Sequence, residues 1–246
     1  MTASIHVPRS VRTAVVLLLA AMGIVSSGCH AKPKPEAKPA PALDIGPPPR
    51  PAIVALGDSI TAGLGLLSSQ AYPGLLEAKL EKDGYDFEVQ NAGVSGDTTK
   101  GALSRLEWTL TPTVKILIIA LGGNDALRGL SPAETHDNIT AIIQAARARG
   151  VEVLVAGMEA PPNLGDDYKM AFHDAFARIA RENPDVPYVP FLLEGVAGKP
   201  ELNQADGIHP NVQGAEVVAS TLYLKLKPLV EMVVDRGGLI APLSER

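Results

Sequence analysis

From residue 51 onward, the chain alternates short apolar segments with longer amphipathic ones. Five segments rich in β-branched and aliphatic residues are typical of strands, at 52–56, 85–90, 116–121, 151–156 and 186–191. Five longer stretches have helical periodicity, at 72–82, 99–109, 132–149, 168–181 and 212–234. Apolar strands that alternate with helices are typical of a mostly parallel sheet covered on both faces. We therefore predict an α/β fold over residues 51–246, a three-layer α/β/α sandwich with a five-stranded, mostly parallel sheet.

The first 28 residues have the composition of a signal peptide. Arg9 and Arg12 precede an apolar stretch at 14–25, which is too short to span a bilayer and is followed by small residues. The single cysteine, Cys29, follows Ser26-Ser27-Gly28, a segment that resembles the lipobox of bacterial lipoproteins. The leucine usual three residues before the cysteine is absent. We predict lipidation of Cys29, with simple cleavage and release as the alternative.

Residues 29–50 form a segment rich in proline, lysine and alanine, with seven prolines between positions 30 and 50. Such a composition cannot bury apolar area and predicts a stiff, extended tether. The chain is therefore expected to be exported. It is either a membrane-anchored lipoprotein that faces the periplasm, or a soluble periplasmic or secreted protein.

Charge and cysteine content exclude several functions. The formal net charge is −5 for the whole chain and −9 for residues 51–246, which argues against nucleic acid as a partner. A single cysteine, which lies before the predicted α/β domain, excludes an internal disulfide and a cysteine-based zinc site. No metal and no cofactor are expected.

Four short polar segments follow predicted strands or precede predicted helices. Because ligands of an open α/β sheet bind beyond the carboxyl ends of its strands, we expect these segments to line one crevice. The first three follow the first three strands, and the fourth lies between the fifth strand and the last helix. They are Gly57-Asp58-Ser59, Asn91-Ala92-Gly93, Gly122-Gly123-Asn124-Asp125 and Asp206-Gly207-Ile208-His209-Pro210.

Three of these residues supply the groups of a serine hydrolase. Ser59 lies where a strand gives way to a helix, so its hydroxyl can be exposed as a nucleophile. Asp206, three residues before His209 and across the flexible Gly207, can accept a hydrogen bond from Nδ1 while Nε2 faces the serine. Taken alone, Ser59 or Asp58 could equally be a helix cap.

The remaining groups can stabilise an oxyanion. We predict that the N–H groups of Ser59 and Gly93 and the side-chain amide of Asn124 bind the negative charge of a tetrahedral intermediate. By itself, Gly-Gly-Asn-Asp is typical of a simple turn, but the four segments together favour catalysis.

Two further histidines, His136 and His173, are expected at the surface or at helix ends. Four leucines could hold an acyl chain, although a core or helix-edge role is favoured for them: Leu64, Leu66, Leu67 and Leu164.

The four polar segments resemble the sequence blocks of the SGNH, or GDSL-type, hydrolases. Segments 95–98, 122–129, 162–165 and 190–196 are most similar to the bacterial thioesterase I/lysophospholipase L1/arylesterase group. The resemblance spans roughly residues 51–231 and implies the flavodoxin-like fold of that family. It also implies Ser59, Asp206 and His209 as catalytic triad, and Ser59, Gly93 and Asn124 as oxyanion hole.

The resemblance implies a serine esterase whose substrate is a small acyl ester, with no cofactor. The expected substrates are aryl and short-to-medium acyl esters and lysophospholipids, with acyl thioesters as a further activity. Acyl-CoA is cytosolic, so an exported enzyme meets esters instead. The alternatives are a carbohydrate O-acetyl esterase on the same fold and, less favoured, a non-catalytic ligand-binding lipoprotein.

Overall fold

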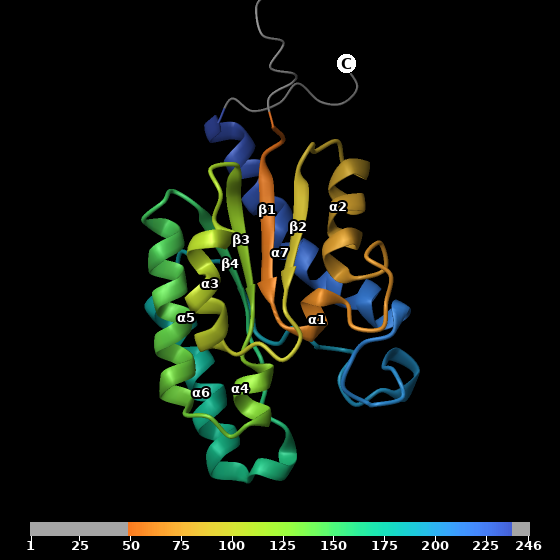
Figure 1. The fold of residues 1–246 in the computed structure, drawn as a ribbon, viewed down its shortest axis with the longest axis vertical. Helices are drawn as coiled ribbons and strands as arrows, with labels where there is room; N and C mark the ends of the chain where they lie inside the picture. Colours follow the sequence, from red (N-terminus) through yellow and green to blue (C-terminus); the bar gives the residue numbers. More distant parts are fainter. Residues whose placement is uncertain (1–48, 238–246) are drawn as a thin grey trace, which may run out of the picture. The chain divides into compact units, whose positions relative to one another are not determined.

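The computed structural model describes residues 49–237 (Figure 1). The predicted signal peptide at 1–28, Cys29 and most of the predicted tether therefore lie outside the described residues. The last residue of that tether, Arg50, contacts the folded domain, since its Nε donates to Asp86 Oδ1 at 2.6 Å and its Nη2 donates to the Phe87 carbonyl at 2.7 Å. Within residues 49–237, no helix combines the length and the apolar character needed to cross a bilayer.

Five parallel strands form the sheet, in the order β2-β1-β3-β4-β5 (Figure 1). This confirms the predicted α/β fold with a five-stranded parallel sheet. The register aligns the last residue of β1, Gly57, with Gly93 of β2 on one side and Ala120 of β3 on the other. Three neighbouring strands thus end at the same level. The strands are β1 (Ala52–Gly57), β2 (Glu88–Gly93), β3 (Val114–Ala120), β4 (Glu152–Ala156) and β5 (Tyr188–Val189).

Helices cover both faces of this sheet. α2 packs against α7, whereas α3, α5 and α6 pack in succession, α3 against α5 and α5 against α6 (Figure 1). Two short helices, α1 and α4, follow β1 and β3. A helix start at Ser59 was expected from the sequence, whereas α4 was not. The α-helices are α1 (Ser59–Ala62), α2 (Tyr72–Lys82), α3 (Thr99–Thr109), α4 (Gly123–Leu127), α5 (Pro132–Arg147), α6 (Asp166–Glu182) and α7 (Val212–Gly237), with 3₁₀ turns at Pro162–Leu164 and Pro200–Leu202.

The strand bounds differ most from the prediction in β2 and β5. Asn91 and Gly93, predicted to follow the second strand, belong to its last three residues, because pairing with β1 continues as far as Gly57. The fifth strand is much shorter than predicted, with only Tyr188 and Val189 paired to β4. Proline lacks an N–H, and Pro187 and Pro190 flank this edge strand on either side.

His136, expected at the surface or at a helix end, is buried within α5. Its ring nitrogens lie 2.8 Å from Asp137 Oδ1 and from Glu182 Oε2 of α6. The packing of α5 against α6 covers the imidazole, and this contact could not be inferred from the sequence of α5 alone. His173 lies on the exposed side of α6, as expected, with Nδ1 2.8 Å from Glu159 Oε1.

The centre of β3 lies in the buried core. Leu117 is fully buried, whereas Leu224 of α7 is 76% exposed. We predict that Leu117→Ala lowers the free energy of unfolding by about 2–5 kcal/mol, because it removes buried apolar contacts and leaves a cavity. Leu224→Ala should change it by less than about 0.5 kcal/mol. Urea denaturation of both variants measures this, and equal losses would contradict the placement of β3 in the core.

Candidate active site

The sequence-predicted site residues come together beyond the carboxyl ends of the central strands. Ser59 is the first residue of α1, two positions after β1 ends, and Gly93 is the last residue of β2. Asn124 lies in α4, which follows β3. Asp206 and His209 belong to the loop between the second 3₁₀ turn and α7, and this loop reaches back to α1. Four segments distant in sequence thus meet around α1 and the residue that precedes it.

Asp58, rather than Ser59, caps helix α1. Its carboxylate oxygen Oδ1 accepts a hydrogen bond from the Ile60 N–H at 3.0 Å. The helix ends after four residues, where Gly63 adopts a left-handed conformation with φ of 72°. Because Asp58 satisfies the helix terminus, the hydroxyl of Ser59 is available for another partner.

Ser59, His209 and Asp206 form a continuous chain of hydrogen bonds. Ser59 Oγ lies 2.8 Å from His209 Nε2, and His209 Nδ1 lies 2.7 Å from Asp206 Oδ2. The other carboxylate oxygen, Asp206 Oδ1, accepts from the N–H groups of Ile208 and His209 at 2.9 and 3.0 Å. These two backbone N–H groups, together with the imidazole, lower the pKa of Asp206 to about 2.

An ionised Asp206 determines which histidine nitrogen carries the proton. A carboxylate can only accept, so Nδ1 donates to it, which leaves Nε2 of the neutral ring as an acceptor for the Ser59 hydroxyl. This tautomer is the one that can remove a proton from the serine.

The loop that holds His209 is tied to the loop after Ser59 by Gln204. The side-chain amide Nε2 of Gln204 donates to the Leu64 carbonyl at 2.7 Å and to the Pro210 carbonyl at 3.0 Å. Its backbone N–H donates to the His209 carbonyl at 2.8 Å. Sequence analysis gave Gln204 no role, because its partner Leu64 lies 140 positions earlier in the chain.

Gly93 lies against α1 and already has a hydrogen-bond partner. Its N–H donates to Asn91 Oδ1 at 3.0 Å, and Asn91 Nδ2 donates to the Thr61 carbonyl at 2.8 Å. A Cβ at position 93 would lie 2.2 Å from the backbone nitrogen of Ala62, so a larger residue would push α1 away from β2. Asn91 therefore connects the end of β2 to the helix that begins with Ser59.

Asp58 is buried and also holds Asn124. Its Oδ2 accepts from Asn124 Nδ2 at 3.3 Å, and only 3% of the residue is exposed. Burial raises the pKa of Asp58 from its ordinary value of 3.8 to about 6, although the Ile60 N–H acts in the opposite direction. One carboxylate thus caps the helix of Ser59 and orients the side-chain amide of Asn124.

A cavity of about 390 Å³ opens beside Ser59, Asn124 and His209. Most of its wall is apolar, with Leu127, Met158, Pro161, Phe191, Leu193 and Ile208 among the lining residues. None of the four leucines suggested for acyl binding lines this cavity. Leu64 and Leu66 line a second, much smaller pocket, which is also bordered by Ser59, His209 and Tyr72, and Leu67 is exposed. Over residues 49–237, no three His, Cys, Asp or Glu side chains cluster as metal ligands would.

The sequence profile of the GDSL-like Lipase/Acylhydrolase family matches residues 55–217. The chain belongs to this family, and its α/β fold agrees with that of solved SGNH hydrolases. A crystal structure of TesA superimposes with a TM-score of 0.69 at 42% identity, and covers 72% of this chain and 99% of that one.

Characterised relatives are similar over the same region. The chain is 42% identical to Esterase TesA of Pseudomonas aeruginosa, over 72% of its own length and 89% of the relative. It is 37% identical to Thioesterase 1/protease 1/lysophospholipase L1 of Escherichia coli, over 72% of its own length and 84% of the relative. The chain is therefore a carboxylic ester hydrolase, as the family resemblance predicted.

The buried carboxylate of Asp58 predicts a specific pH dependence of stability. Because its pKa is higher in the folded than in the unfolded chain, its contribution to stability is complete below about pH 4 and is lost as the pH rises through about 6. Asp58→Asn preserves the helix cap but cannot titrate. Between pH 4 and 7, the free energy of unfolding of the wild type should fall by about 2–3 kcal/mol relative to the variant. Chemical denaturation at each pH tests this, and parallel curves would contradict it.

Proposed function

We propose that Ser59 is the nucleophile of a two-step ester hydrolysis, with His209 as general base and Asp206 as the carboxylate that orients it. The N–H groups of Ser59 and Gly93 and the amide of Asn124 form the oxyanion hole in this proposal. Its main support is the hydrogen-bonded chain from Ser59 Oγ through the His209 ring to Asp206, with contacts of 2.8 and 2.7 Å.

In the first step, Ser59 Oγ attacks the ester carbonyl carbon while its proton passes to His209 Nε2. The carboxylate of Asp206 stabilises the imidazolium that results. The tetrahedral intermediate then collapses, His209 protonates the leaving alcohol, and an acyl-serine remains. Water, activated by the same histidine, releases the acid and restores the serine.

The proposed oxyanion donors are held in place before the substrate arrives. The Ser59 N–H is the first of α1, so the helix does not need it for its own hydrogen bonds. Asn124 uses its amide nitrogen to bond Asp58, and the second proton on that nitrogen can serve the oxyanion. The Gly93 N–H exchanges its acceptor, from Asn91 Oδ1 to the oxyanion. The donors of Ser59 and Asn124 therefore need little reorganisation during the reaction, whereas Gly93 gives up its hydrogen bond to Asn91.

The cavity wall favours apolar acyl or aryl groups over sugars. We propose aryl esters, short-to-medium acyl esters and lysophospholipids as substrates, in agreement with the esterase and lysophospholipase names of the relatives. Thioester hydrolysis, named for the Escherichia coli relative, is proposed as a secondary activity, because an exported enzyme does not meet cytosolic acyl-CoA.

Turnover of p-nitrophenyl esters with two to twelve acyl carbons tests the mechanism and the substrate class together. Ser59→Ala should lower kcat by about 10⁴-fold or more, because it removes the nucleophile. Ser220→Ala is the control, since this exposed serine lies in α7 and bonds only the Glu216 carbonyl. Wild-type activity in Ser59→Ala would contradict the mechanism. A sharp preference for acetate would instead favour the carbohydrate O-acetyl esterase.

We further propose that the protein is exported and anchored through a lipid on Cys29, which lies outside the described residues. Support comes from the apolar segment at 14–25 and the small residues before Cys29. Mass spectrometry of the mature protein from cell membranes should find an N-terminal, lipid-modified Cys29, and Cys29→Ala should release the enzyme from the membrane fraction. An unmodified mature N-terminus would favour a soluble periplasmic or secreted enzyme.

A further inference from the structure

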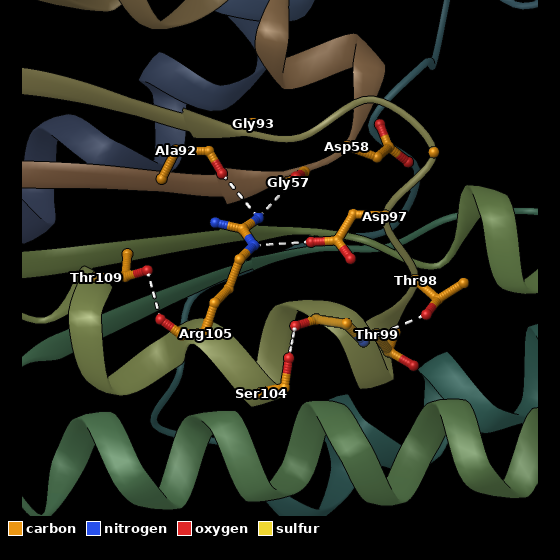
Figure 2. Close-up of polar contacts among 12 residues, drawn as sticks. Gly57, Asp58, Ala92, Gly93, Asp97, Thr98, Thr99, Ser104, Arg105 and Thr109 are labelled. Atoms are coloured by element: carbon orange, nitrogen blue, oxygen red, sulfur yellow. Dashed lines mark hydrogen bonds and ion pairs between the residues drawn. The ribbon is translucent and has the colours of Figure 1, made fainter.

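Arg105, in the middle of α3, turns its guanidinium group toward the carboxyl ends of the two strands that carry the proposed site (Figure 2). Its Nη2 donates to the Ala92 carbonyl at 2.9 Å and to the Gly57 carbonyl at 3.1 Å, and its Nε donates to Asp97 Oδ2 at 2.8 Å. The Arg105 side chain is only 25% exposed, and that of Asp97 only 10%. One cation thus connects β1, β2 and α3.

The two carbonyl groups that Arg105 binds belong to particular peptide units. The Ala92 carbonyl and the Gly93 N–H are parts of one planar peptide, so holding the oxygen fixes the direction of the N–H. The Gly57 carbonyl belongs to the peptide that leads into Asp58, the cap of the nucleophile helix. Arg105 therefore holds the peptide that contains the proposed oxyanion donor Gly93 and the peptide that precedes Asp58 and Ser59.

We propose that Arg105 is a positioning residue for ester hydrolysis, which orients and polarises the Ala92–Gly93 peptide so that the Gly93 N–H binds the oxyanion. This inference rests on the proposed function of Ser59 and Gly93. A charged donor on a carbonyl oxygen draws electron density from the peptide and makes its N–H a stronger donor. The effect is greatest in the transition state, where the negative charge on the substrate oxygen develops.

The surroundings of Arg105 fix its orientation. Asp97 belongs to Ser95-Gly96-Asp97-Thr98, a segment singled out in the sequence without a role, and it binds Nε, next to the Nη2 that binds the two strand carbonyls. Asp97 in turn packs against Gly101, where a Cβ would lie 1.9 Å from its Oδ1. A lysine ammonium lacks the planar fork that bonds two carbonyls and a carboxylate at once. Arginine is thus the residue that this arrangement requires.

Arg149 provides a matched control. Its guanidinium also binds a backbone carbonyl and a carboxylate, with Nη1 3.2 Å from the Leu110 oxygen and Nη2 3.1 Å from Glu107 Oε1. These partners lie at and beyond the carboxyl end of α3 rather than at the ends of β1 and β2. Arg149→Met therefore removes a comparable set of contacts without touching the peptides of the proposed site.

The experiment compares the wild type with Arg105→Met, Arg105→Lys and Arg149→Met in the full chain. For each we would measure kcat and KM on p-nitrophenyl butyrate, the inhibition constant of an alkyl trifluoromethyl ketone, and the melting temperature. The ketone forms a tetrahedral adduct with the serine and so reports on oxyanion binding. Arg105→Met should lower kcat about 10- to 100-fold. This is less than the loss of about 100- to 1,000-fold that follows deletion of an oxyanion donor itself, because the Gly93 N–H is still present. Its KM should change less than about threefold, and its inhibition constant should rise in parallel with the loss of kcat.

Arg105→Lys should show an intermediate loss, and Arg149→Met should keep kcat within about twofold of the wild type. The inference is overturned if a folded Arg105→Met has the kcat of Arg149→Met, or if its ketone affinity is unchanged. If Arg105→Met does not fold, a folded Arg105→Lys with wild-type kcat also overturns it. A wild type that is inactive, or an active Ser59→Ala, would instead count against the proposed function itself.

Discussion

The alignment of strand ends at the carboxyl edge of the sheet is the constraint on which the rest of the site depends. Gly57, Gly93 and Ala120 share one level in the register of β1, β2 and β3. The segments after these strands therefore start close together, and two of them, α1 and α4, are helices of only four and five residues. The long loop before α7 then needs to bring only Asp206 and His209 to a site whose other parts are already assembled.

Much of this arrangement could be predicted from the sequence, because its signals are local. Apolar runs such as the one in β3 define the buried strands, and α2 and α3 have the bounds that helical periodicity predicted. Three of the polar segments lie at or just after the carboxyl ends of parallel strands, so their meeting at one edge follows from parallel topology. The three-residue spacing alone linked Asp206 to His209. In the structure, Asp206 Oδ2 lies 2.7 Å from His209 Nδ1.

The remaining features depend on contacts between distant parts of the chain. From the sequence, Asp58 and Ser59 are both candidates for the cap of α1. In the structure Asp58 accepts from the Ile60 N–H, whereas Ser59 Oγ pairs with a histidine 150 positions later. The burial of His136 depends on α6, and the role of Gln204 depends on Leu64. Arg105 would be taken for an ordinary helix residue, since its carbonyl partners carry no signature in the amino-acid sequence.

The hydrogen bond from Gly93 to Asn91 bears on how such an enzyme would distinguish a bound substrate from a reacting one. Before substrate binds, the Gly93 N–H already donates a hydrogen bond to the side-chain oxygen of Asn91. A neutral ester carbonyl is a weak competitor for that donor, whereas an oxyanion is a strong one. Gly93 would then contribute little to the affinity for the intact ester and much to the affinity for the transition state, and such a difference in binding is what raises kcat.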